Sequence, residues 1–206
     1  ESEWIVTRSS YDVRGNLLTI TDALGREAFR HAYDLLDRPL CVDSIEAGLR
    51  TTILNALGAP VEYRDSKGTM AVREYTDALN RLTHVWAQDD GGSPFTLRER
   101  LTYGDGGTNA QTNAVRNAAR TKYQLGKLVQ HDDEAGRCRY PAYDFKGNGI
   151  EKVRLVISDT ALASGWSPDW SASNADTALD PTEYHTTTHF DALNRPIDVS
   201  YPADVN

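Results

Sequence analysis

A short turn phrase recurs along this chain and limits what it can fold into: an aspartate or asparagine, two variable residues, then glycine, asparagine or aspartate. The side-chain oxygen at the first position accepts hydrogen bonds from backbone N–H groups further on and starts a turn. The fourth residue must take a left-handed conformation, which glycine, asparagine and aspartate tolerate best. The first position is held by Asp12, Asp22, Asp34, Asn55, Asp65, Asp77, Asp133, Asp144 and Asp191. The fourth is held by Gly15, Gly25, Asp37, Gly58, Gly68, Asn80, Gly136, Gly147 and Asn194.

The spacing of these turns is regular. The first three are separated by 10 and 12 residues, and the next three repeat the same steps 43 residues later. A fixed internal period of strands and turns is the signature of a repeat architecture. We therefore predict an array of β-hairpins with positive φ at the turn glycines, namely Gly15, Gly25, Gly68, Gly136 and Gly147.

The segments between turns alternate apolar or aromatic residues with polar ones, which favours half-buried antiparallel strands. Phe29, His31 and Tyr33 share one face of such a strand, and residues 97–103 show the same pattern. Residues 109–120 are rich in alanine and asparagine and predict a short helix. Prolines stand just after three turns, at strand starts, where a missing N–H does least harm: Pro39, Pro60 and Pro196.

The predicted fold class is all-β: hairpins wound into a curved, spiralling antiparallel sheet with short irregular or helical insertions. Regular repeats cover residues 1–87 and 123–158, insertions cover 88–122 and 159–182, and a last repeat covers 183–206. Trp166 and Trp170 are expected to anchor the second insertion, because two indole rings are costly to leave in water. Both ends look cut, and an array with uncapped ends exposes strand edges. We therefore expect a segment of a longer protein.

The turn phrase resembles the YD repeats of RHS (rearrangement hot spot) proteins. The resemblance sharpens at 142–148 (AYDFKGN), 168–171 (PDWS) and 190–196 (FDALNRP), together with 125–127 (LGK) and the pair Gln130 and His131. This ordered set is similar to the C-terminal RHS region of toxin-complex B components and related SpvB-type insecticidal toxin proteins. Gly149 departs from the pattern, since an apolar strand residue is expected there, and this leaves the start of the following strand open.

The resemblance implies a structural function without catalysis or cofactors. In such proteins RHS repeats wind into a secreted hollow shell that encloses a toxic effector, the C-type component, and holds it unfolded. The implied partners are the remainder of the shell, the enclosed effector and, through other domains, a pore-forming translocation component. The alternative is an extracellular adhesion or recognition module, because YD repeats also occur in cell-surface proteins.

Composition narrows the remaining classes. The net charge of −8 argues against a nucleic-acid-binding surface, and no apolar run reaches the length of a membrane span. Two cysteines, Cys41 and Cys138, are too few for a disulfide framework, and either two free thiols or one bridge fits them.

Several patterns that suggest chemistry have simpler explanations. His185 and His189 have the spacing of a helical metal site, but the threonines between them favour a strand. The glycine-rich run 104–107 lacks the lysine of a phosphate loop, and the repeated aspartates lack the order of a calcium loop. The acidic pairs 89–90 and 132–133 are expected to be solvated charges in turns and loops. Asp180 and Pro181 lack the residues that follow them in the RHS self-cleavage region. We predict no enzyme activity and no metal.

Overall fold

The computed structural model describes residues 4–106 and 111–203. Fourteen antiparallel strands follow one another in sequence order in one sheet, which is not closed within the described residues. By its internal contacts the chain divides into two compact units, residues 1–73 with 87–95 and residues 74–86 with 96–206. The predicted all-β class is therefore confirmed.

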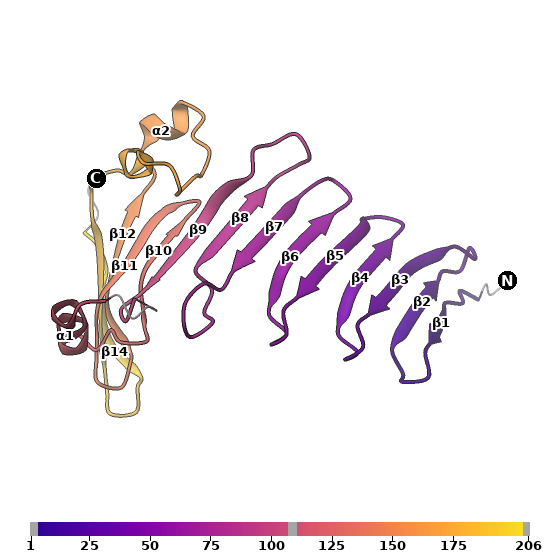
Figure 1. Cartoon of the computed structure of the whole chain (residues 1–206), viewed down its shortest axis with the longest axis horizontal. Coiled ribbons are helices and arrows are strands. Elements are labelled where there is room, and N and C mark those ends of the chain that lie inside the picture. The colour runs from indigo at the N-terminus through magenta and orange to yellow at the C-terminus, as the bar shows by residue number, and fades with distance from the viewer. Residues whose placement is uncertain (1–3, 107–110, 204–206) are drawn as a thin grey trace. The chain divides into compact units, whose positions relative to one another are not determined.

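The first unit is a single layer of strands joined by turns that alternate between two edges (Figure 1). Its strands are β1 (Arg8–Tyr11), β2 (Leu17–Thr21), β3 (Glu27–Tyr33), β4 (Pro39–Ser44), β5 (Gly48–Leu54), β6 (Pro60–Asp65) and most of β7 (Met70–Glu74). None of its described residues is buried. Hydrogen bonds and cross-strand side-chain pairs therefore stabilise this layer in place of a hydrophobic core. The rings of Phe29, His31 and Tyr33 stack at 6.4 Å centroid spacing, on one face as their alternation predicts.

The second unit contains the buried core. Its strands are most of β8 (His84–Gln88), then β9 (Thr96–Tyr103), β10 (Leu128–Asp133), β11 (Gly136–Tyr143), β12 (Gly149–Val156), β13 (Tyr184–Phe190) and β14 (Pro196–Ser200). Leu97, Ile157, Trp170 and Ala178 form the core cluster, and Trp166 packs against it. The 159–182 insertion is thus anchored by its tryptophans, as predicted, and Trp170 is only 1% exposed.

The residues that the structure describes include three short helical segments outside the strands. Helix α1 (Asn113–Thr121) begins where Thr112 Oγ1 accepts a hydrogen bond from Val115 N at 3.3 Å. Helix α2 (Asp159–Ala163) begins with Ser158 in the same role, and a 3₁₀ turn spans Ala175–Ala178. Within the second unit, α1 and α2 lie at opposite ends of the strands (Figure 1). No helix of the described residues is long and apolar enough to cross a membrane.

Most elements predicted from the sequence are present, some with different first residues. The strand expected at 97–103 is β9, and the expected helix is present but begins at Asn113; Gly107 and Asn109 lie outside the described residues. The three prolines after turns start β4, β6 and β14. Despite the expectation at Gly149, β12 starts there, and that residue pairs with Tyr143 across the turn. Both cysteines are free thiols.

Candidate functional site

The Asp12 turn shows how the repeated phrase shapes the chain. Asp12 Oδ1 accepts hydrogen bonds from the backbone N–H groups of Arg14 (2.8 Å) and Asn16 (2.9 Å). The N–H of Gly15 donates to the carbonyl of Asp12 at 3.2 Å, and φ of Gly15 is +89°. A type I turn followed by a left-handed residue is a standard three-residue hairpin connection with a bulge. The aspartate thus satisfies the amides of a turn that its own backbone closes.

Eight of the nine phrases repeat this geometry. In each, the first side chain accepts from the N–H groups two and four residues later, and φ of the fourth residue lies between +53° and +91°. The residues with positive φ are Gly15, Gly25, Asp37, Gly58, Gly68, Asn80, Gly147 and Asn194. These eight copies of the phrase thus form one kind of turn.

The ninth phrase, Asp133 to Gly136, forms a different turn. Asp133 and Gly136 pair directly, so only two residues connect β10 and β11. The φ of Gly136 is +129°, and a Cβ there would lie 2.2 Å from the Leu155 carbonyl oxygen. Glycine is needed at this position by the close approach of β12 as well as by its backbone conformation.

The turn aspartates are also bound by the side chain four residues later. Arg26 Nε donates to Asp22 Oδ2 at 2.8 Å, and Asn16 Nδ2 donates to Asp12 Oδ2 at 3.0 Å. The backbone N–H of Arg26 is the main reason that the pKa of Asp22 is lowered. The amide of Asn16 has the same effect on the pKa of Asp12. These carboxylates therefore stay ionised, and accept strongly, at neutral pH.

Neighbouring turns on one edge of the first unit are tied together. Arg14 Nη1 donates to the carbonyl of Leu35 and to Asp37 Oδ1, both at 3.0 Å, and Asn16 Nδ2 donates to the same carboxylate oxygen at 2.7 Å. Arg38 Nη1 continues the series to the carbonyl of Asn55 at 3.2 Å. The Asp12 and Asp34 turns are thus each bonded to the next turn on this edge.

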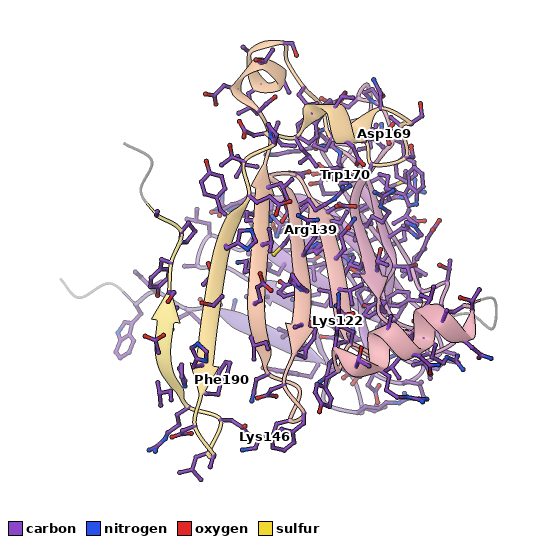
Figure 2. The ribbon with its side chains drawn as sticks, turned by 90° about the vertical axis from the view of Figure 1, so that its left-hand side faces the viewer. Lys122, Arg139, Lys146, Asp169, Trp170 and Phe190 are labelled. Atoms are coloured by element: carbon purple, nitrogen blue, oxygen red, sulfur yellow. The ribbon has the colours of Figure 1, made fainter. Side chains whose placement is uncertain are left out.

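The second unit has the same lateral bonds. Asn148 Nδ2 donates to Asn194 Oδ1 at 3.0 Å, and Lys146 Nζ donates to the Ala192 carbonyl at 2.5 Å. The guanidinium of Arg81 binds Asp77 within its own turn and Asp105 in the next at 2.7 Å. Figure 2 shows Lys146 and Phe190 toward the end of this unit opposite to Asp169 and Trp170.

Sequence reasoning missed the function of three tyrosines that stand directly before turns. Tyr33, Tyr103 and Tyr143 each donate from the hydroxyl to a carbonyl at or just before the start of the preceding strand, at 3.0, 2.9 and 2.5 Å. Each ring therefore fastens the end of its own strand to the start of the one before. The regular placement of tyrosine before the turn was the available signal, but the acceptor is set by strand pairing.

A buried carboxylate in the second unit corrects one prediction. Asp132, expected to be a solvated charge, lies in β10 with 0% of its surface exposed. It accepts from Arg100 Nη2 at 2.8 Å and from Arg137 Nε at 2.5 Å. Arg100 and Arg137 are its direct partners on the two neighbouring strands. The prediction was wrong because these cross-strand arginines replace the water that a free carboxylate would need.

The same cluster holds the 159–182 insertion. Arg137 Nη2 binds Asp176 at 2.7 Å, and its guanidinium carbon lies 5.5 Å from the centroid of the Trp170 ring. Arg100 Nη1 donates to the Trp170 carbonyl at 3.2 Å, and Trp170 Nε1 donates to the carbonyl of Asp133 at 3.1 Å. One carboxylate and two arginines thus connect the insertion to three strands of the sheet.

One of the two candidate metal residues, His185, forms pairs with carboxylates. His185 lies in strand β13 and contacts Glu151 and Glu183 at 3.1 and 3.2 Å. Residues 4–106 and 111–203 contain no group of three or more His, Cys, Asp or Glu that could hold a metal ion. Some of the charged groups form carboxylate–arginine and carboxylate–histidine pairs between neighbouring strands, such as Asp132 with Arg137 and Glu99 with His131.

Substitution of Gly25 by valine tests the turn geometry. Its φ is +77° and nothing lies within 4 Å of an added Cβ, so the cost is conformational alone. We expect the free energy of unfolding to fall by roughly 1–2 kcal/mol, because a β-branched residue is strained in the left-handed region. Urea unfolding measures this, with Gly25→Asn as the matched control that keeps most of the stability. Equal losses for both variants would contradict the turn assignment.

The geometry defines a class of protein. It is an open antiparallel array of β-hairpins, in which a side chain, usually aspartate, closes the turns and hydrogen bonds connect neighbouring turns. No protein-family model matches the sequence. No curated protein matches it either.

Solved toxin-complex structures share the fold. The crystal structure of TcdB2-TccC3-TEV matches with a TM-score of 0.80 and 25% identity, over 96% of this chain and 9% of that one. The crystal structure of TcdB2-TccC3-Cdc42 gives 0.79 and 24% over the same shares, and the Photorhabdus luminescens Tc holotoxin pore gives 0.78 and 24% over 95% and 9%. The chain therefore spans less than a tenth of these neighbours, and the resemblance to toxin-complex proteins is confirmed at the level of fold.

Proposed function

We propose that this chain is a wall segment of an RHS-repeat shell in a secreted, toxin-complex-like system, where it encloses an effector without catalysing a reaction. The observation that carries the proposal is the match of nearly the whole chain to a small part of toxin-complex chains. In a wall built from repeated hairpins, each segment has the same fold as a small part of a much longer chain, and this match has that form.

The internal structure supports this function. No described residue of the first unit is buried, so its hairpins depend on lateral bonds to neighbours and not on a core. The Arg14, Asn16 and Arg38 bonds stiffen one edge without adding a second layer. A thin, laterally bonded sheet can bound a cavity, whereas a two-layer sandwich fills its own interior.

The ends of the strand order favour continuation of the wall. Among the described residues, strands β1 and β14 each have one neighbour in the sheet, so each presents an edge that no described strand pairs with. On β14, Ile197 and Val199 are 68% and 36% exposed. Exposed strand edges recruit other strands. Under this proposal the edges pair with the remainder of the shell, and the effector and a translocation component are the further partners.

Sedimentation of the chain tests the edge assignment. We expect self-association that increases with concentration, and we expect the double variant Ile197→Lys with Val199→Lys to reduce it, because charged residues oppose edge pairing. Leu193→Lys is the control, since Leu193 is 71% exposed but lies in a turn. A chain that stays monomeric at every concentration, or association abolished equally by the turn variant, would contradict the proposal and favour a recognition module.

A further inference from the structure

A cationic pocket lies at one end of the second unit. It has a volume of about 390 Å³ and lies between the end of α1, the segment before β10 and the β11–β12 turn. Arg120, Lys127 and Lys146 contribute three positive charges, and Tyr123 and Phe145 contribute aromatic walls. Figure 2 shows Lys146 at the hairpin tip that forms one side.

The pocket is strongly positive for a chain of net charge −8. Its one carboxylate, Asp144, is engaged by its own turn: Oδ1 accepts from Lys146 N and Asn148 N, and Oδ2 accepts from Asn148 Nδ2 at 2.8 Å. Within the described residues the side chains of Arg120 and Lys127 have no carboxylate partner. Two cations thus face the pocket without a counter-charge, which favours an anionic ligand.

The backbone of Tyr123 supplies an independent observation. Tyr123 lies just after α1 and has φ of +53°. Its backbone N–H donates to the carbonyl of Arg120, and the N–H of Gln124 donates to the carbonyl of Ala119. This is the helix-ending arrangement in which glycine is the usual residue. Burial of the Tyr123 ring does not offset the backbone strain, since the residue is 52% exposed. A strained, exposed aromatic in a pocket wall indicates that the ring has a function.

We propose that this pocket binds an acidic peptide segment that carries an aromatic or apolar side chain beside its carboxylates. The free cations bind the carboxylates, while Tyr123 and Phe145, which is 75% exposed, cover the apolar side chain. The backbone N–H groups of the Asp144 turn are already used by Asp144, so the pocket lacks the ring of free amides typical of phosphate sites. The binding site does not depend on the proposed shell function.

Fluorescence anisotropy tests the proposal with a fluorescein-labelled peptide that alternates glutamate and phenylalanine. We expect saturable binding that weakens with added NaCl, and no binding of the peptide with glutamine in place of glutamate. Arg120→Glu and Lys127→Glu are each expected to weaken binding about ten-fold, because attraction becomes repulsion. Lys152→Glu, an exposed lysine on β12 outside the pocket, makes the same charge change and should leave binding within about two-fold.

Tyr123→Gly separates a ligand-binding ring from a structural one. Glycine fits the left-handed position, so the thermal midpoint should hold or rise while peptide binding weakens. Loss of the fold with this variant would show that the ring is structural and overturn the proposal. So would an absence of saturable binding, or equal losses for Lys127→Glu and Lys152→Glu. Inorganic tripolyphosphate displacing the peptide at equal concentration would identify a general anion site and also overturn it.

Discussion

Replacement of Asp132 by alanine is expected to lower the free energy of unfolding by about 3–5 kcal/mol. The carboxylate is fully buried and is shared by Arg100 and Arg137, so its removal takes away the negative charge between two neighbouring guanidinium groups and leaves Arg137 only its pair with the exposed Asp176. Equilibrium urea unfolding followed by tryptophan fluorescence measures the loss, with the chain dilute enough to remain monomeric.

Asp198→Ala is the matched control for this experiment. Asp198 lies on β14 and is exposed, so its removal should change stability by less than about 0.5 kcal/mol. Asp132→Asn keeps the shape of the side chain and removes its charge, and should fall between the two. If Asp132→Ala costs no more than Asp198→Ala, the buried cluster does not hold the second unit together.

Replacement of Trp170 by alanine is expected to cost about 3–5 kcal/mol and to release the 159–182 insertion from the sheet. The indole is 1% exposed, packs on Leu97 and Ile157, and donates from Nε1 to the Asp133 carbonyl. Its loss removes this packing and the ring beside Arg137. Limited proteolysis should then cut within residues 159–182 of the variant, whereas we expect the unaltered protein to resist cleavage there.

Two further variants test whether loss of packing by Trp170 causes the release of the insertion. Trp170→Phe retains most of the packing but loses the hydrogen bond to Asp133, so we expect a smaller loss and a protected insertion. Trp4→Ala removes a tryptophan that is 89% exposed and should leave unfolding and proteolysis unchanged. Cleavage of the insertion in the Trp4 variant, or its protection in Trp170→Ala, would contradict the anchoring function.

The turns could be read from the sequence because their chemistry is local. The carboxylate of Asp12 accepts from the backbone amides two and four residues later, so the donors and the acceptor of these hydrogen bonds lie within five residues of sequence. The same holds for the left-handed residue, whose conformation depends on its own side chain. Gly136 is an exception that the phrase does not reveal, because the Leu155 carbonyl of the neighbouring strand sets its close contact.

The buried site could not be read from the sequence, because its contacts depend on strand register. Asp132 meets arginines 32 residues before and 5 residues after it. A shift of β10 by one residue would turn Asp132 to the other face, away from both arginines, so no local pattern marks Asp132 as buried. The tyrosine hydroxyls have the same difficulty, since Tyr143 reaches Leu128 only when β10 and β11 pair as they do.

Electron cryomicroscopy of the complete protein that contains this chain tests the central claim most directly. If the chain is a wall segment, β1 and β14 will each pair with a further strand, and the extended sheet will surround a cavity that holds another polypeptide. Solvent-exposed edges, edges capped by non-strand elements, or a sheet that encloses nothing would contradict the shell assignment.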